Sequence, residues 1–126
     1  MIDYRELVGT KYKVHGRSIE EGFDCWGLVL YVYKSMGIQL LDPCYENLKD
    51  RLKVNQELIN SGMFIKIERF ENNCIIEILD RGEPVHVGLY IGNGMMIHCT
   101  SRNGVICEPV NRYKKNIVGL YKVGSN

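Results

Sequence analysis

The hydrophobic pattern of this chain changes from a helical period in its first half to a strand-like period in its second half. Apolar residues recur at helical spacing after Asp24, and this predicts a helix over Cys25–Met36, capped by Asp24 and ended by Gly37. A shorter helix is expected over Asp3–Val8, and a second, more polar one over Glu46–Asn60. The apolar positions that define the main helix are Leu28, Val29, Val32, Tyr33 and Met36.

From residue 64 onward, short apolar or alternating runs are separated by turn residues, which is typical of strands. Gly92-Asn93-Gly94 predicts a tight hairpin between two of them. Helices followed by antiparallel strands indicate an α+β fold, so we expect N-terminal helices packed on an antiparallel sheet of about five to six strands. The expected strands are Phe64–Phe70, Ile75–Leu79, Val85–Ile91, Met95–Cys99, Val105–Glu108 and Val118–Val123.

Size and charge narrow the class of protein. The chain has 126 residues, which suits one domain, so we expect residues 1–126 to form a single catalytic domain. The formal net charge of +1 argues against a nucleic-acid partner. No apolar run reaches the ~18 residues of a membrane-spanning helix. The start, MIDYRELVGT, does not have the pattern of a signal peptide, so synthesis in the cytoplasm without membrane insertion is expected.

The five cysteines are odd in number and include no C-x-x-C pair, which favours reduced thiols over a disulfide framework. A zinc site built from Cys99, Cys107 and a histidine stays open as an alternative. The paired spacings of structural zinc sites are missing, however, so we expect no metal and no cofactor. Apart from Cys25, the cysteines are interpreted as small buried apolar residues: Cys44, Cys74, Cys99 and Cys107.

Cys25 is the strongest candidate for chemistry, because it begins the predicted main helix. The positive end of a helix dipole lowers the pKa of a thiol there and favours the nucleophilic thiolate. His86 and His98 lie downstream in strand-like segments. Taken alone, a cysteine of this kind is more often buried and inert, and a strand histidine is more often a core residue. Together, a nucleophile, a base and an orienting group indicate a cysteine hydrolase.

Strand alternation bears on whether the two histidines meet. His86, Gly88 and Tyr90 share one face of their strand, and Met96 and His98 share one face of the next. The histidines therefore face the same side of the sheet if Gly88 or Tyr90 lies opposite Met96. Gly88 is also expected to leave room beside His86 for the helix that carries the cysteine.

Four segments, KYKVHGR, GFDCWGLV, HVGLYIGNGMMIH and GVICEPVNRYKKNIVGLYKV, resemble the NlpC/P60 family of papain-like cysteine peptidases. The resemblance implies a papain-like fold, with Cys25 as the nucleophile, His86 as the base and His98 as the third polar residue. It also implies that Tyr12 contributes to the oxyanion site or substrate pocket, and that Asp24 helps to recognise a free amino group. The family usually cleaves the bond between D-γ-glutamate and a diamino acid in peptidoglycan stem peptides.

Two features qualify the resemblance. Trp26, directly after the cysteine, is similar to the phage-tail-associated branch, which implies tail proteins as partners and a place in the virion. His15-Gly16 stands where many members have Gly-Gly, which bears on specificity. Three alternatives stay open: a structural tail-assembly component with a vestigial site, an amidase, and an acyltransferase on the same fold. The acyl-enzyme step is common to the reactions, so the nucleophile and base do not distinguish them.

Overall fold

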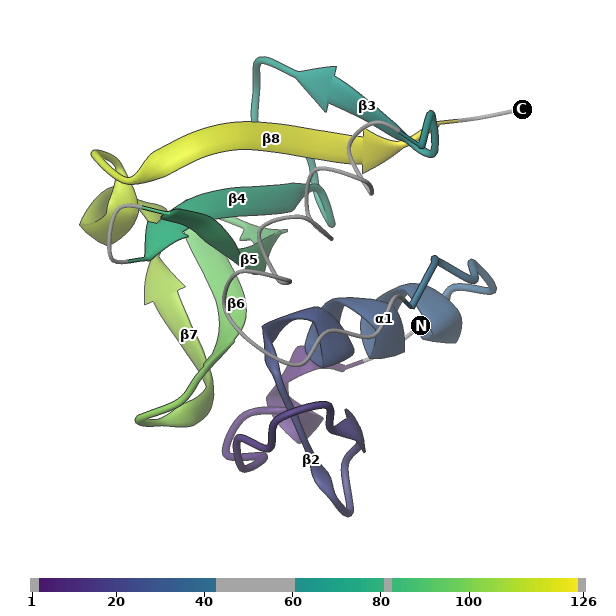
Figure 1. The fold of residues 1–126 in the computed structure, drawn as a ribbon. Helices are drawn as coiled ribbons and strands as arrows, with labels where there is room; N and C mark the ends of the chain where they lie inside the picture. The colour runs from purple at the N-terminus through teal and green to yellow at the C-terminus, as the bar shows by residue number, and fades with distance from the viewer. Residues whose placement is uncertain (1–2, 43–60, 81–82, 125–126) are drawn as a thin grey trace.

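One helix packs against a six-stranded antiparallel sheet in this structure, a computed structural model that describes residues 3–42, 61–80 and 83–124 (Figure 1). The strand order is β3-β8-β4-β5-β6-β7. The expected α+β architecture is confirmed. The strands of this sheet are β3 (Phe64–Ile67), β4 (Ile75–Asp80), β5 (Glu83–Gly92), β6 (Met95–Thr100), β7 (Gly104–Pro109) and β8 (Ile117–Val123).

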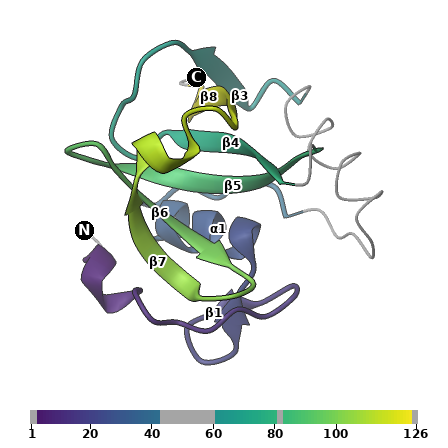
Figure 2. The same ribbon diagram turned by 90° about the vertical axis from the view of Figure 1, so that its left-hand side faces the viewer.

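The main helix, α1, runs over Cys25–Ser35, one residue shorter than predicted. Asp24 caps it, because its Oδ1 accepts a hydrogen bond of 2.7 Å from the Gly27 amide. Gly37 follows the helix with a φ of 81°, a left-handed conformation that suits glycine. Along one face of the sheet, α1 buries the apolar side of its amphipathic pattern, as Figures 1 and 2 show from two directions.

A small antiparallel pair, β1 (Arg17–Ser18) and β2 (Gly22–Phe23), lies on the far side of α1 from the sheet (Figures 1 and 2). The sequence pattern did not predict this pair. Backbone approaches here are very close, since a Cβ built on Gly16 would lie 2.2 Å from the carbonyl oxygen of Gly22. Glycine is therefore required for this segment to fold against the start of the helix.

The pairing of β5 with β6 decides where the histidines point. Asn93 and Gly94 form the two-residue turn with φ values of 54° and 75°, which matches the twist of the flanking strands. Tyr90 then lies opposite Met96, and Gly88 opposite His98. The predicted register is confirmed, and His86 and His98 share one face of the sheet.

The expected use of Gly88 is wrong. A Cβ there would lie 2.8 Å from Met96 Cε and 3.1 Å from His98 Cβ, so the space is filled by side chains of β6 and not by α1. The physical reason is register. Gly88 lies directly opposite His98, and its lack of a side chain leaves room for the side chains of His98 and Met96 on that face.

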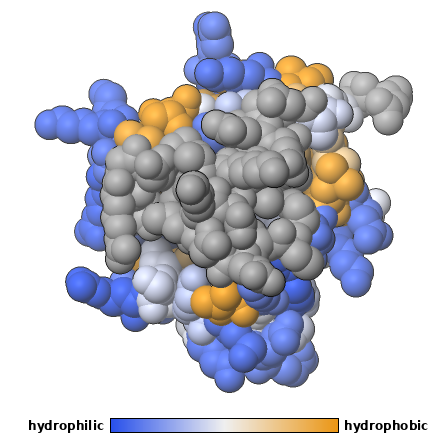
Figure 3. Space-filling model, viewed as in Figure 1, coloured by the Kyte–Doolittle hydropathy of each residue, from blue (hydrophilic) through white to orange (hydrophobic). Residues whose placement is uncertain are grey.

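Two apolar clusters sandwich the sheet. The first joins α1 to one face and includes Leu28, Leu89 and Ile97. The second covers the other face with Ile76, Ile78 and Met96, among others. On the surface shown in Figure 3, apolar residues form separate small groups between polar ones. None of the helices in the described ranges is long and apolar enough to cross a membrane.

The structure differs from the sequence-based predictions at several other elements. The predicted N-terminal helix is a 3₁₀ turn, η1 (Tyr4–Glu6), capped by Asp3 as expected. A second 3₁₀ turn, η2 (Val110–Tyr113), was not predicted. The helix expected over Glu46–Asn60 and Cys44 lie outside the described residues. Cys74 and Cys99 are buried as predicted, whereas Cys107 is only partly buried.

Candidate active site

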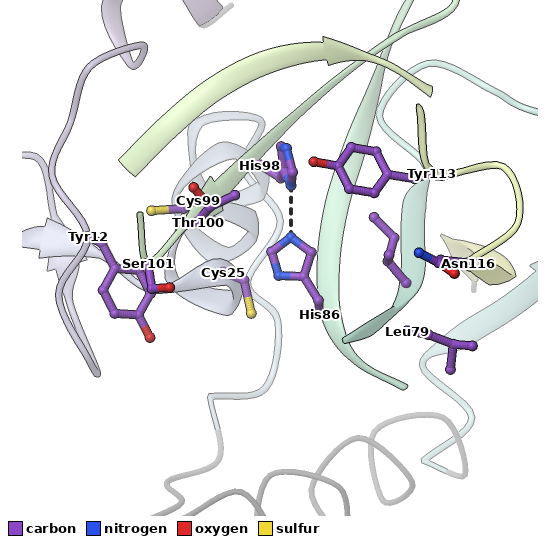
Figure 4. A pocket seen from close by; sticks show the side chains of 11 residues that line it. Tyr12, Cys25, Leu79, His86, His98, Cys99, Thr100, Ser101, Tyr113 and Asn116 are labelled. Atoms are coloured by element: carbon purple, nitrogen blue, oxygen red, sulfur yellow. Dashed lines mark hydrogen bonds between the residues drawn. The ribbon is translucent and has the colours of Figure 1, made fainter. Parts of the chain in front are cut away.

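A pocket of about 380 Å³ opens where the start of α1 meets the edge of the sheet formed by the end of β4, the start of β5 and the end of β6 (Figure 4). The antiparallel order brings these strand ends to one edge. The pocket thus gathers side chains that are far apart in the chain. Its lining residues are Tyr12, Cys25, Ile78, Leu79, His86, His98, Cys99, Thr100, Ser101, Tyr113 and Asn116.

Cys25 occupies the first position of α1, and its side chain lines the pocket while being only 4% exposed. The backbone N–H groups of the first helical turn point toward this end of the helix, and they favour negative charge there. In Figure 4 the sulfur of Cys25 lies beside the imidazole of His86. The structure thus brings together the cysteine and the first histidine that the sequence analysis singled out.

His86 and His98 are in direct contact across β5 and β6. The Nε2 atom of His86 lies 2.8 Å from Nδ1 of His98, within hydrogen-bonding distance, and the two rings meet edge to face. His98 is 1% exposed, whereas His86 is partly exposed at the pocket wall. Figure 4 shows the other ring nitrogen of His86, Nδ1, turned to the side where Cys25 lies.

The far side of His98 contacts a carboxylate. Its Nε2 lies 2.6 Å from Oε2 of Glu108 on β7, and the Tyr113 hydroxyl donates to the same oxygen at 2.5 Å. Arg112 donates to Oε1 of Glu108 at 3.0 Å. Burial and the neighbouring His86 lower the pKa of His98, despite the opposing effect of Glu108. The His98 imidazole is therefore neutral at pH 7.

The carboxylate itself is ionised. Burial raises the pKa of Glu108, but the hydrogen bonds from Tyr113 and His98 together lower it below its ordinary value. Burial and the bond to Glu108 raise the pKa of Tyr113 to about 12, so the phenol stays protonated and donates.

Tyr12 lies in the pocket wall, next to the strand pair that precedes α1, where it bridges to Phe23. Asp24 is placed differently. It is fully buried and does not line the pocket. Its carboxylate accepts hydrogen bonds from the His15 amide at 3.1 Å, from Gly27 and from the Arg17 guanidinium at 2.8 Å.

The zinc alternative finds no matching geometry in the part of the chain that the structure describes. Within residues 3–42, 61–80 and 83–124, no group of three or more histidine, cysteine, aspartate or glutamate side chains is arranged to hold a metal ion. Cys99 instead donates its thiol to the carbonyl oxygen of Phe23 at 3.1 Å, and burial raises the pKa of that thiol to about 12.

Two residues of the site, Glu108 and Tyr113, were not predicted from the sequence. A signal was present for the first, because a charged residue ended a predicted strand on the face shared with His98. In the observed register His98 lies opposite Ile106 and Met96 lies opposite Glu108, which makes Glu108 the diagonal neighbour of His98. Tyr113 had no such signal, since it belongs to a 3₁₀ turn that the pattern did not reveal.

Known proteins are similar to this chain over most of its length. The model of the NlpC/P60 family matches residues 9–121. The gamma-DL-glutamyl hydrolase of Bacillus subtilis (strain 168) is 34% identical over 116 residues, which cover 89% of this chain and 25% of the relative. The murein DD-endopeptidase MepS/murein LD-carboxypeptidase of Escherichia coli (strain K12) is 27% identical over 112 residues, covering 88% and 53%. The chain thus spans about a quarter and about half of these relatives.

The fold has relatives among solved structures. The NlpC/p60 domain of the peptidoglycan hydrolase SagA superposes with a TM-score of 0.66, covering 96% of this chain and 92% of that domain at 23% identity. At this identity the likeness concerns the fold alone.

Proposed function

Because this chain belongs to the NlpC/P60 family, we propose that it is a cysteine endopeptidase that hydrolyses peptidoglycan stem peptides, at the bond between D-γ-glutamate and a diamino acid. The observation that carries the proposal is that Cys25, at the start of α1, lines one pocket with His86, which is hydrogen-bonded to His98. The names of the relatives, a gamma-DL-glutamyl hydrolase and a murein endopeptidase, support the substrate class. The match over residues 9–121 supports one catalytic domain.

In the proposed reaction, Nδ1 of His86 takes the proton of the Cys25 thiol, and the thiolate attacks the carbonyl carbon of the scissile bond. The carbonyl oxygen, as negative charge develops on it, accepts a hydrogen bond from the backbone N–H of Cys25 at the start of the helix. His86 then protonates the leaving amine, and a thioester remains on the sulfur. His86 then takes a proton from water as the water oxygen attacks the thioester carbon; the C–S bond breaks, the acid is released, and the proton returns to the sulfur of Cys25.

The pocket wall suits peptide groups. Apart from the histidines and the cysteines, its polar members are uncharged hydroxyl and amide side chains, namely Tyr12, Thr100, Ser101, Tyr113 and Asn116. These can donate to and accept from a substrate backbone without demanding a counter-charge. We assign Tyr12 to the substrate pocket. Recognition of a free amino group by Asp24 stays a prediction, because both of its carboxylate oxygens already accept hydrogen bonds within the protein.

The proposal predicts that defined muropeptides are cleaved by the parent chain and not by the Cys25→Ala variant, since alanine removes the nucleophile. Loss of the nucleophile reduces turnover by about 10⁴-fold or more. Mass spectrometry of the products identifies the bond broken. The matched control is Cys107→Ala, which removes a thiol that does not line the pocket and should retain activity.

Two outcomes would redirect the proposal. Cleavage only at a D,D cross-link would keep the enzyme and correct the scissile bond. No cleavage by either the parent or Cys25→Ala, with both proteins folded, would refute the peptidase and revive the alternatives of a vestigial site or another acyl-transfer reaction. Association with a phage tail stays a prediction from the sequence, and the relatives described above give it no support. Trp26, on which it rests, packs inward and donates its indole N–H to the Leu41 carbonyl at 3.1 Å.

A further inference from the structure

We propose that Glu108 is a positioning residue that fixes the order of protons through His98 and His86, so that Nδ1 of His86 is the proton acceptor facing Cys25. The inference rests on the proposed function, because it assigns His86 as the base. It goes beyond the three residues that the family resemblance implies, and adds a fourth side chain that does not touch the substrate.

The first step is the direction of each hydrogen bond. An ionised carboxylate only accepts, so the 2.6 Å contact between Glu108 Oε2 and His98 requires the proton on Nε2 of His98. A neutral imidazole carries one ring proton, so Nδ1 of His98 has none and must accept. The 2.8 Å contact between His98 and His86 therefore uses the Nε2–H of His86 as its donor.

The second step concerns the reacting nitrogen. With the proton of neutral His86 held on Nε2, its Nδ1 carries a lone pair and can take the thiol proton. After that transfer the hydrogen bond from Nε2–H of His86 to His98 is unchanged. The same hydrogen-bond arrangement therefore serves both the neutral His86 base and its imidazolium. The opposite order, with a proton on Nδ1 of neutral His86, would leave no acceptor for the thiol. Glu108 excludes that order.

Neighbouring side chains keep Glu108 ionised and fixed beside His98. Tyr113 donates to the same oxygen that His98 contacts, and its ring packs edge-on to the His98 ring at 5.2 Å. Arg112 contacts the other oxygen, but its side chain is 67% exposed, so that ion pair contributes little. The Glu108 side chain is itself only 13% exposed. Tyr113 and the burial of His98 are therefore the main constraints.

Few other charged groups lie near enough to compete with Glu108 in setting the protonation of the two histidines. Among the described residues, the titratable and charged groups that face the histidine–carboxylate hydrogen bonds come from six segments of the fold. They are Tyr12 in the N-terminal segment, Cys25 on α1, His86 on β5, His98 and Cys99 on β6, Glu108 on β7, and Arg112 and Tyr113 on η2. The carboxylate of Glu108 is the only acidic side chain among them. Its loss should therefore change the protonation of the whole chain of rings.

The decisive experiment needs no substrate. Nitrogen-15 NMR of histidine side chains in the parent should show His98 and neutral His86 both protonated at Nε2. In Glu108→Gln the amide can donate to His98 as well as accept, so a mixture with protonated Nδ1 is expected. Tyr113→Phe keeps the carboxylate but removes the hydroxyl that holds it, so a smaller shift of tautomers than in Glu108→Gln is expected. Arg112→Gln removes only the exposed partner and serves as the matched control.

The second readout is kinetic. With muropeptide, Glu108→Gln should lower kcat about ten- to a hundredfold, because part of the enzyme carries the wrong tautomer, while KM changes little. The alkaline limb of the kcat/KM profile should move to lower pH, since removal of the anion disfavours the His86 imidazolium. A merely structural role would lower the melting temperature and leave kcat per folded molecule and the alkaline limb unchanged.

Parental tautomers together with a parental kcat in folded Glu108→Gln would overturn the proposal. The shift of tautomers in that variant, with Arg112→Gln unchanged, would support it. Failure of the proposed function is distinguishable, because an inactive parent would still report its histidine tautomers by NMR. If Glu108→Gln does not fold, Glu108→Asp is used. It keeps the charge but shortens the reach, and it should shift the tautomers only if the contact itself sets them.

Discussion

The carboxylate of Asp24 accepts three hydrogen bonds at full burial, from the amides of His15 and Gly27 and from the guanidinium of Arg17. A side chain so occupied acts first on the position of its neighbours. It holds the segment before α1 against the first turn of the helix, directly beside the candidate nucleophile. We therefore infer that Asp24 sets the location of Cys25. Whether Asp24 also contacts the substrate is a separate question.

Replacement of Asp24 by Asn separates the two roles. The amide oxygen can still accept from Gly27, but the charge paired with Arg17, whose side chain is 24% exposed, is lost. We expect a loss of roughly 1–3 kcal/mol in the free energy of unfolding, measured in urea. If the side chain does not contact the substrate, the preference for stem peptides with a free over an acetylated amine should be unchanged. A collapse of that preference would establish the role in recognition.

For the control, Asp3→Asn changes another capping aspartate of the chain, which is exposed and remote from the pocket. It should leave activity unchanged and alter stability by less than the Asp24 variant, because exposed caps and ion pairs contribute about 1 kcal/mol or less.

At the scale of elements, α1 depends on a backbone contact with the segment before it. A Cβ built on Gly27 would lie 2.1 Å from the Gly16 carbonyl oxygen and 2.9 Å from Nη1 of Arg17. No rotamer can relieve an overlap of this kind, because it involves backbone on both sides. The glycine that follows two residues after Cys25 is thus a packing requirement, which the helical pattern alone does not reveal.

The Gly27→Ala variant gives a prediction whose sign is diagnostic. In an exposed helix this change stabilises by up to about 1 kcal/mol. Here we expect destabilisation of about 1–3 kcal/mol, since the segment that carries Gly16 must move away. Lys34→Ala, on the exposed side of the same helix, is the control and should be nearly neutral. Thermal and urea unfolding compare the three proteins, and a more stable Gly27→Ala would show that the contact is not as tight as described.

The local sequence pattern predicted the bounds of an element well where residues close in sequence determine those bounds. α1 was placed within one residue of its observed end, because its cap, its apolar spacing and Gly37 all agree. The β5–β6 hairpin followed from Asn93-Gly94. The insertion of β8 between β3 and β4 was not predicted, because strand order depends on contacts between segments more than thirty residues apart. The short pair β1–β2 escaped because two-residue strands have no period to detect.

On the scale of the whole molecule, the candidate site exists only when the sheet and helix are assembled. Its pocket takes residues from α1, β4, β5, β6 and η2. The sequence could predict Cys25, His86 and His98, because a helix start and strand alternation place them. It could not place Glu108 next to His98 without the β6–β7 register, nor Tyr113 without the 3₁₀ turn that follows β7. The places of Glu108 and Tyr113 in the site are thus consequences of the tertiary fold.

Buried His98 makes global stability depend on pH. Its pKa is lowered by burial and by His86, so the unfolded chain binds a proton more readily than the folded one. The free energy of unfolding should therefore fall as pH drops below the unfolded value of about 6.5, toward the lowered value in the folded state. Glu108, whose pKa is also lowered, adds a loss that begins only below its ordinary value of 4.5. The loss caused by His98 therefore begins at a higher pH than the loss caused by Glu108.

Urea unfolding of the parent and of His98→Asn at pH 7.5, 6.5 and 5.5 tests this final prediction. The variant should be less stable at pH 7.5, because a buried ring is lost, but its stability should change less between pH 6.5 and 5.5. Glu77, whose pKa is raised by burial, is present in both proteins and contributes equally to their pH dependence. The difference in slope therefore belongs to His98 and to its coupling with His86. Equal slopes would mean that folding does not lower the pKa of His98, and the neutral His98 on which the proton order through Glu108 depends would lose its support.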